Sequence, residues 1–93
     1  LEGIYSHQAW ADHPDGESHA RKQFERFRKI LKRLLSEGIS FGKIHLANSA
    51  ATIKFPEMRF DLVRIGISMY GLYPDSSMAR DPVIALSPVM SVK

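Results

Sequence analysis

The chain has 93 residues, with 13 basic and 10 acidic side chains, a formal net charge of +3 and no cysteine. Its composition, 44% hydrophobic and 25% charged, is that of an ordinary folded domain, and the charge is too small to indicate a nucleic-acid or membrane-surface protein. The lack of cysteine excludes a disulfide framework and thiolate metal sites. No apolar run reaches the roughly 20 residues of a membrane span, so we expect a soluble, cytoplasmic protein.

The first predicted elements are a strand and a loop. Residues 1–5 are mostly apolar and run into a polar Ser-His-Gln cluster, which is typical of a strand. His13–Gly16 reads His-Pro-Asp-Gly, and this composition predicts a loop because no helix interior tolerates it. The chain starts at Leu1 with an apolar run rather than a polar terminus, so we expect it to be part of a longer protein.

An amphipathic helix is predicted from about Glu17 to Glu37, where apolar residues recur at helical spacing. Asp15 or Ser18 is expected to cap its start, and Gly38 is expected to end it in a left-handed conformation. The apolar residues of the predicted buried stripe are Phe24, Phe27, Ile30, Leu31, Leu34 and Leu35.

The opposite face of this helix is rich in lysine and arginine. Glu25 is spaced to pair with Arg21 and Lys29, four residues away on either side. A phosphate-binding helix can have this composition, but the solvated outer face of a packed helix has it more often. We favour the solvated face and predict no nucleic-acid partner.

Three further elements complete the predicted core. Lys43–Ala47 and Leu62–Tyr70 are apolar runs that predict strands, and Ala50–Lys54 between them is compatible with a short helix. Strands that are almost continuously apolar and alternate with helices are typical of a parallel sheet covered on both faces. The sequence therefore predicts an α/β fold, and three strands with one long helix suggest a part of a larger sheet.

A change from apolar to polar sequence after Leu72 predicts a domain boundary. Residues 74–87 are polar and punctuated by proline, and a new apolar run, Pro88–Val92, follows them. We expect a first domain over residues 1–73, a linker over 74–87 and the start of a second domain over 88–93.

Ser49 is the first candidate for ligand binding. It lies with Asn48 where a predicted strand passes into the short helix, in the string Ala-Asn-Ser-Ala-Ala-Thr. Serine and asparagine are preferred helix caps, and a serine hydroxyl beside free backbone N–H groups also makes an anion site. The pattern alone leaves both interpretations open.

Arg64 and Gly66 form the second candidate cluster, within an otherwise apolar strand. Burying a guanidinium is costly unless it has partners, and a glycine two residues later lets a ligand or backbone approach closely. One explanation is an ion pair with Asp61 or Glu57, and the other is a contact with a ligand.

Two histidines, His7 and His45, lie at the ends of predicted strands. If the strands are parallel, both share one sheet edge with Ser49 and Gly66, which is the edge where ligands of such folds collect. A zinc site that combines His7 with Asp12 and His13 lacks the spacing of known sets. We predict no metal.

The strings that contain these residues resemble those of the alanine racemases. They are H-x-A-x-A-D over residues 7–12, H-L-A-N-S-A-A-T over residues 45–52 and D-L-V-R-I-G-I-S-M-Y-G-L-Y-P over residues 61–74. Enzymes of this family interconvert L- and D-alanine with pyridoxal 5′-phosphate (PLP), and they supply D-alanine for bacterial cell-wall peptidoglycan. The resemblance implies a PLP-dependent isomerase that acts as a homodimer.

The resemblance also implies the fold. The family has a (β/α)₈ TIM barrel followed by a β-rich domain. Leu1–Tyr5, Lys43–Ala47 and Leu62–Ile67 would be the last three strands of the barrel. The chain is therefore expected to be the C-terminal part of the barrel leading into the β-rich second domain, which would open at Pro88.

Site roles follow from the resemblance residue by residue. Ser49 would hold the PLP phosphate through its hydroxyl and N–H, and the backbone N–H groups of Gly66 and Ile67 would complete the cradle. Arg64 would donate to the pyridine nitrogen, supported by His45, with Asn48 nearby and His7 beneath the cofactor as the candidate catalytic residue. The residues assigned by resemblance are His7, His45, Asn48, Ser49, Arg64, Gly66 and Ile67.

The family's two catalytic bases, a lysine of the first barrel strand and a tyrosine of the second domain, have no matching motif here. We therefore expect the 93 residues to be inactive alone. Gln8 and Trp10 replace residues that are more often small or apolar in the family, and Ser68 replaces a common alanine. A serine racemase of the same fold and a non-catalytic PLP-binding protein are the alternatives.

Overall fold

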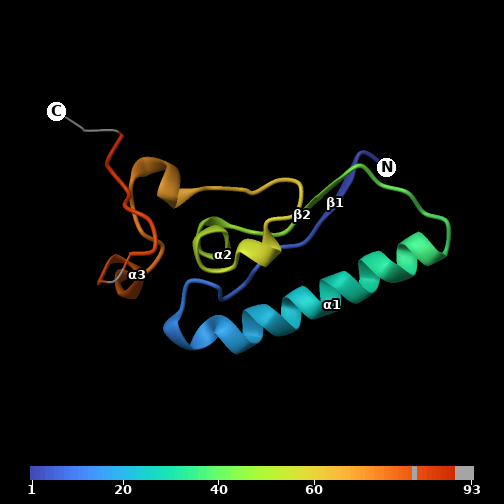
Figure 1. Ribbon diagram of the computed structural model, residues 1–93, viewed down its shortest axis with the longest axis horizontal. Coiled ribbons are helices and arrows are strands. Elements are labelled where there is room, and N and C mark those ends of the chain that lie inside the picture. Colours follow the sequence, from blue (N-terminus) through green and yellow to red (C-terminus); the bar gives the residue numbers. More distant parts are fainter. Residues whose placement is uncertain (81, 90–93) are drawn as a thin grey trace.

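The computed structural model describes residues 1–80 and 82–89 and has an elongated shape, with extents of 52 × 29 × 17 Å (Figure 1). Among these residues, no helix has the length and apolar character needed to cross a membrane. In chain order the elements are β1 (Gly3–Tyr5), η1 (Pro14–Gly16), α1 (Glu17–Ser36), β2 (Lys43–His45), α2 (Ser49–Lys54), η2 (Pro56–Met58), η3 (Ile67–Tyr70) and α3 (Ser76–Arg80), where η marks a 3-10 helix.

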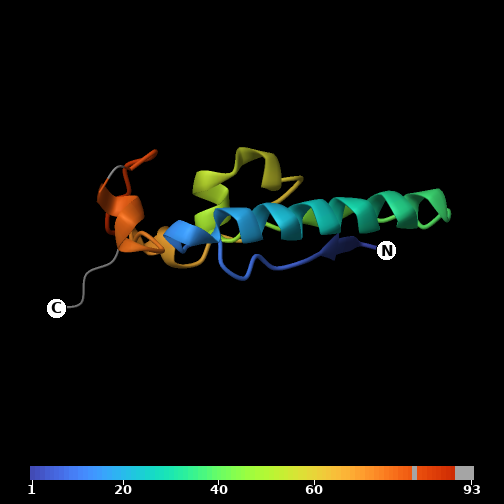
Figure 2. The same ribbon diagram turned by 90° about the horizontal axis from the view of Figure 1, so that it is seen from below.

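β1 and β2 form a parallel two-stranded sheet, in which Gly3 faces Lys43 and Tyr5 faces His45. The chain passes from one strand to the other through α1, which runs along the length of the molecule beside the strands (Figures 1 and 2). Two parallel strands need such a crossover because a tight turn cannot join them. The predicted strand–helix–strand unit is confirmed for this part of the chain.

The prediction of a third strand over Leu62–Tyr70 is wrong. The segment follows β2 only at its start, where Leu62 makes an isolated parallel bridge with His45. Beyond Gly66 the chain turns into η3, a 3-10 helix that ends at Gly71 in a left-handed conformation with φ 79°. Apolar character alone does not determine a strand, and in the described residues this run has a neighbour on one side only. Its apolar side chains are largely exposed, with Leu62 at 43% and Ile67 at 45%.

α1 ends as predicted but begins differently. Gly38 has φ 80°, Gly38 N–H donates to Leu35 O at 3.1 Å, and Ile39 N–H donates to Leu34 O at 3.0 Å. This pair of bonds is a Schellman motif, which satisfies the last carbonyl groups of the helix. The predicted caps Asp15 and Ser18 are wrong, because the N-cap is Gly16, which makes no side-chain bond. The one-turn helix η1 leads directly into α1 and removes the need for a side-chain cap.

The core lies between α1 and the segment that follows β2. α1 contributes Ala20, Phe24, Phe27 and Leu31, which pack with buried residues of α2 and η2 such as Ile53 and Met58. The predicted stripe is therefore too wide, because Ile30 is 53% exposed and Leu35 is 56% exposed. Periodicity marks an apolar face, but the width of that face that is buried depends on which segments lie against it.

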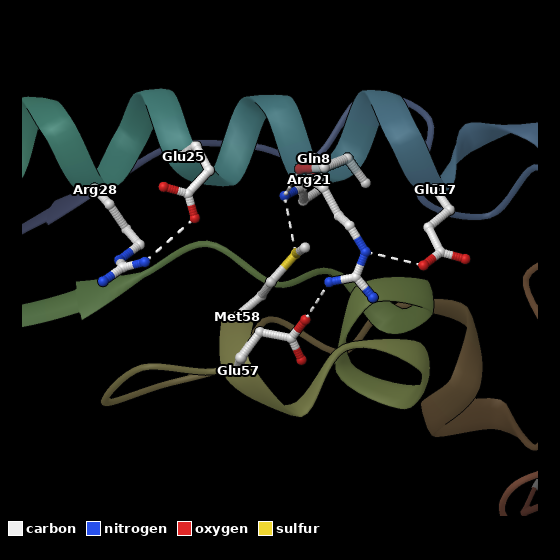
Figure 3. Close-up of polar contacts among 8 residues, drawn as sticks. Gln8, Glu17, Arg21, Glu25, Arg28, Glu57 and Met58 are labelled. Carbon is white, nitrogen blue, oxygen red and sulfur yellow. Dashed lines mark hydrogen bonds and ion pairs between the residues drawn. The ribbon is translucent and has the colours of Figure 1, made fainter.

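Polar contacts attach α1 to η2 (Figure 3). Arg21 donates to Glu17 Oε1 at 2.9 Å and to Glu57 Oε1 at 2.7 Å, and these bonds raise the pKa of Arg21. Glu25 pairs with Arg28 at 3.2 Å instead of the predicted Arg21 and Lys29. The predicted pairing of Glu25 with Arg21 is wrong because Arg21 bonds to Glu17 and Glu57 instead. Four-residue spacing shows which side chains can pair, but not which of them do.

The segment after Leu72 contains α3, inside the predicted linker 74–87. Tyr73 holds part of this segment, because its hydroxyl donates to Ile84 O at 2.9 Å and accepts from Leu86 N–H at 3.1 Å. Most of the predicted second-domain start, 88–93, lies outside the described residues, which end at 89. The predicted boundary stays a prediction.

Candidate functional site

A cavity of about 510 Å³ opens at the carboxyl ends of β1 and β2, a size that suits a small-molecule ligand. Its walls come from segments far apart in the chain: the loop after β1, the start of α2, and the segment from residue 64 onward. Six of the seven residues assigned by resemblance line it, namely His7, Asn48, Ser49, Arg64, Gly66 and Ile67.

Ser49 is the first residue of α2, and it is 6% exposed. Asn48 caps this helix, because its side-chain oxygen accepts from Ala51 N–H at 3.0 Å. The Asn48 amide also donates to the carbonyl of Gln8 at 3.1 Å. Asn48 therefore ties the start of α2 to the loop after β1 and fixes where the Ser49 hydroxyl lies.

Gly66 and Ile67 belong to a second segment of the cavity wall, which reaches Ser49. Gly66 N–H donates to Ser49 Oγ at 2.9 Å, and Ser68 N–H lies 3.5 Å from the same oxygen. Ile67 is the first residue of η3, so its N–H is not used by that helix. A hydroxyl and neighbouring backbone N–H groups thus meet at one end of the cavity.

Arg64 is placed by main-chain bonds to β2 and its extension. Asp61 N–H donates to Ile44 O at 3.1 Å, and Arg64 N–H donates to Ala47 O at 2.9 Å. These bonds lay residues 61–64 alongside β2. The half-buried Arg64 side chain is thereby directed toward the ends of both strands.

The guanidinium of Arg64 has several acceptors. One terminal nitrogen donates to His45 Nδ1, and the other donates to Ser6 O at 2.8 Å. The second nitrogen also lies 3.5 Å from His7 Nδ1 and from Leu46 O. A guanidinium carries five N–H donors, and these contacts leave Nε–H and one terminal N–H for a ligand.

An ion pair does not account for Arg64. The carboxylate of Asp61 accepts from Ile44 N–H at 2.8 Å, and Glu57 pairs with Arg21. Among the described residues, no salt bridge includes Arg64. Of the two explanations for an arginine in an apolar segment, the ion pair with Asp61 or Glu57 is therefore wrong.

The contact with Arg64 also determines the form of His45. Arginine is only a donor, so His45 Nδ1 must be an acceptor and the neutral imidazole carries its hydrogen on Nε2. His45 contacts Arg64 but does not line the cavity. It is the only one of the seven residues assigned by resemblance that does not. His13, which was considered with His7 and Asp12 as a zinc ligand, stacks on Trp10 with ring centroids 4.7 Å apart. Within the described residues, no three histidine, aspartate or glutamate side chains are grouped as metal ligands.

Two residues near the site have contacts that the sequence patterns did not predict. Gln8 is 1% exposed, donates to Ala20 O at 3.3 Å and lies 3.2 Å from Met58 Sδ. Tyr5 stacks on His45. The polar Gln8, three residues after β1, and the aromatic Tyr5 at the end of β1 were the available signals, but only tertiary contacts reveal what they touch.

A larger hollow, of about 760 Å³, runs along α1 between Glu17 and Lys29. All of its lining residues belong to this one helix, and they are mostly charged and exposed. Side chains of one convex helix form an outer surface, whereas the smaller cavity joins three segments of the chain. We therefore take the smaller cavity as the candidate site.

The chain is similar to known proteins over nearly all of its length. The family model "Alanine racemase, N-terminal domain" matches residues 1–74. Alanine racemase 1 of Oceanobacillus iheyensis is 46% identical over 93 residues, and the alanine racemase of Desulforamulus reducens is 48% identical over 93. These matches cover 100% of this chain but only 24% and 25% of the two relatives, so the chain spans about a quarter of their length.

Solved structures agree with this result. The crystal structure of alanine racemase from Bacillus anthracis with bound L-Ala-P matches with a TM-score of 0.86 and 41% identity, over 95% of this chain and 22% of that chain. An alanine racemase of Clostridium difficile in complex with cycloserine matches with a TM-score of 0.84 and 34% identity, over 95% and 23%.

The comparisons correct the predicted fold class. The matching model describes the N-terminal domain, so the chain corresponds to the N-terminal region of alanine racemases, where the barrel domain starts. The prediction of the C-terminal part of a (β/α)₈ barrel leading into a β-rich second domain is wrong. Three short strings locate a family but do not determine which part of its fold they occupy. The resemblance itself is confirmed, and the chain belongs to the alanine racemase family.

Proposed function

We propose that the cavity at the ends of β1 and β2 holds PLP, with the phosphate at Ser49, Gly66 and Ile67 and the pyridine ring toward Arg64. The observation that carries this proposal is the 2.9 Å contact between Gly66 N–H and Ser49 Oγ. It brings a hydroxyl and the backbone N–H groups of a second segment to one place, which is the donor set that a phosphate needs.

The chemistry of these donors fits a phosphate group. The Ser49 hydroxyl can rotate to donate to an anion, and Gly66 N–H, which donates to Ser49 Oγ, would donate to that anion instead. Ile67 N–H lies next along the chain and is not used by η3. Ser49 is buried, so bonds to a charged phosphate would form partly out of water, where they are stronger.

Arg64 fits the other end of the cofactor. PLP, when bound, supplies an electron sink for the reaction at the α carbon of an amino acid. The guanidinium does not give up its proton at physiological pH, so Arg64 donates to an unprotonated ring nitrogen and leaves the ring a weak sink. Weak stabilisation favours rapid return of the α proton over side reactions, which suits a racemase.

We further propose that the whole protein interconverts L- and D-alanine and so supplies D-alanine for peptidoglycan. Its relatives are named alanine racemases, and one solved relative holds L-Ala-P, which favours alanine over serine as the substrate. His7 lies in the cavity beside Arg64. We propose that it lies beneath the cofactor and belongs to the hydrogen-bond network of Arg64. The homodimer stays a prediction.

The test is a titration of the purified protein with pyridoxine 5′-phosphate, a PLP analogue without the aldehyde that would react with surface lysines. We expect saturable binding that inorganic phosphate competes away, and much weaker binding of pyridoxine. Ser49→Ala is expected to weaken binding roughly tenfold or more, because it removes a hydrogen bond to a charged group.

Ser40→Ala is the matched control, since Ser40 is exposed and lies between α1 and β2, away from the cavity. It should bind like the unmodified protein. Equal affinity for pyridoxine and its phosphate, or equal loss in both serine variants, would refute the proposed phosphate cradle.

A further inference from the structure

Tyr5 lies at the end of β1, directly opposite His45 in the parallel register. Its ring stacks on the His45 imidazole with the centroids 5.1 Å apart and an interplanar angle of 9°. The Arg64 guanidinium carbon lies 5.2 Å from the centroid of the same ring. One exposed aromatic side chain therefore contacts both Arg64, which is proposed to face the pyridine ring, and His45, which supports Arg64.

Each contact with Tyr5 restricts the side-chain torsions of His45 or of Arg64. The imidazole torsion of a histidine is broad, so a bond to Arg64 requires something that holds the ring with Nδ1 turned toward the guanidinium. A ring stacked almost parallel to His45 does this. The long Arg64 side chain also has many rotamers, and a guanidinium within about 6 Å of an aromatic face is attracted to it.

We propose that Tyr5 is a positioning residue for the ring-nitrogen end of the site. Its aromatic face holds His45 in the orientation that accepts from Arg64, and thereby directs Arg64 at the ligand ring. The inference rests on the proposed function for the identity of that ligand, but the orientation of His45 can be measured without it. The phenol hydroxyl is not needed for either contact, so phenylalanine should replace Tyr5.

Tyr5 acts on one end of the cavity only. It does not line the cavity, and the donors at the phosphate end belong to α2 and η3 rather than to β1. Because Tyr5 is 67% exposed, its replacement removes little buried surface and should leave the fold intact. A loss of ring recognition without a loss of phosphate recognition is the signature of this role.

The first measurement is the nitrogen spectrum of ¹⁵N-histidine-labelled protein without ligand, at about pH 8, above the ordinary histidine pKa of about 6.5. A His45→Gln variant assigns the His45 signals. We expect one tautomer, with hydrogen on Nε2, in the unmodified protein and in Tyr5→Phe. In Tyr5→Leu we expect the signals to move toward a mixture of tautomers.

The second measurement compares affinities for pyridoxine 5′-phosphate and for inorganic phosphate. Tyr5→Leu should weaken the first by about three- to tenfold, the range expected for one stacking or cation–π contact, and leave the second unchanged. Tyr5→Phe should retain both affinities.

Three results would overturn the inference: an unaltered His45 spectrum in Tyr5→Leu, an equal loss of both ligands, or a Tyr5→Phe variant as impaired as Tyr5→Leu. If the unmodified protein binds neither ligand, the proposed function fails. The His45 spectrum then still decides whether Tyr5 orients the pair.

Discussion

Arg64 links the proposed ring-nitrogen end of the candidate site to the sheet. Its backbone is held by Ala47, and its side chain reaches the main chain of Ser6 and the ring of His45. A charged group with this many fixed partners cannot easily change its direction. A carboxylate at this position would reverse the sign of the charge beside the proposed ring nitrogen, so it tests the electronic role of Arg64.

We expect Arg64→Glu to increase side products relative to racemisation in protein that has racemase activity. A carboxylate keeps the ring nitrogen protonated and makes the cofactor a stronger electron sink, so transamination competes better with proton return. The measurement is the ratio of pyruvate formed to alanine racemised. An unchanged ratio in an otherwise folded variant would contradict the role of Arg64.

At the scale of elements, α1 depends on its C-terminal turn. Gly38 adopts φ 80° and provides the hydrogen bond that closes the helix on Leu35 O. A Cβ added at this glycine meets no atom within 4 Å, so the cost of a side chain there is conformational rather than steric packing.

Gly38→Ala is expected to lower the free energy of unfolding by roughly 1 kcal/mol, because an alanine resists the left-handed conformation. Gly38→Asn should cost less, since asparagine tolerates this conformation best after glycine. Urea denaturation measures both. An alanine variant as stable as the unmodified protein would argue against the Schellman ending.

α3 provides a pH-dependent element. The pKa of Asp75 lies below its ordinary value, first because its carboxylate accepts from the Ser77 hydroxyl and second because it accepts from Ser77 N–H. A folded-state pKa below the unfolded value means that the contribution is present above about pH 4 and is lost as the pH falls through the folded-state value.

We therefore expect Asp75→Ala to melt at a lower temperature than the unmodified protein at pH 7, and the two melting temperatures to approach each other as the pH falls below the ordinary aspartate pKa of about 4. Ser77→Ala, which removes only the first-named bond, should show a smaller difference. A gap that is constant across this pH range would assign the effect to packing instead of the charge.

At the scale of the whole molecule, the core depends on a few aromatic residues of α1. Phe27 is 6% exposed and packs edge to face on Phe60, with centroids 5.8 Å apart, and Phe24 approaches the same ring at 5.8 Å. Phe60 lies in the segment before Arg64, so the contact that fixes α1 also fixes the approach to the site.

Phe27→Ala is expected to cost about 3–5 kcal/mol, a large part of the stability of a domain this small. Ile30→Ala serves as its comparison, because Ile30 is on the same helix but 53% exposed, and it should change stability by about 0.5 kcal/mol or less. Thermal or urea unfolding distinguishes the two. Similar losses of unfolding free energy in both variants would indicate that Ile30 belongs to the core, as the sequence predicted.

Local patterns were sufficient for the features that depend on neighbouring residues. The helix of residues 17–36, its ending at Gly38 and the family resemblance could all be predicted from the sequence, because helical periodicity, glycine geometry and motif strings are local. The grouping of His7, Ser49 and Gly66 at one sheet edge could also be predicted, since parallel strands bring their carboxyl ends together.

The tertiary structure alone decided which neighbours each segment has. Whether Leu62–Tyr70 is a strand, whether Ile30 is buried and whether Arg64 bonds to a carboxylate or to His45 all depend on residues that are distant in the sequence. An apolar run or a charged residue within it indicates that packing or hydrogen-bonding partners are needed. Which groups become those partners is determined by the folded chain.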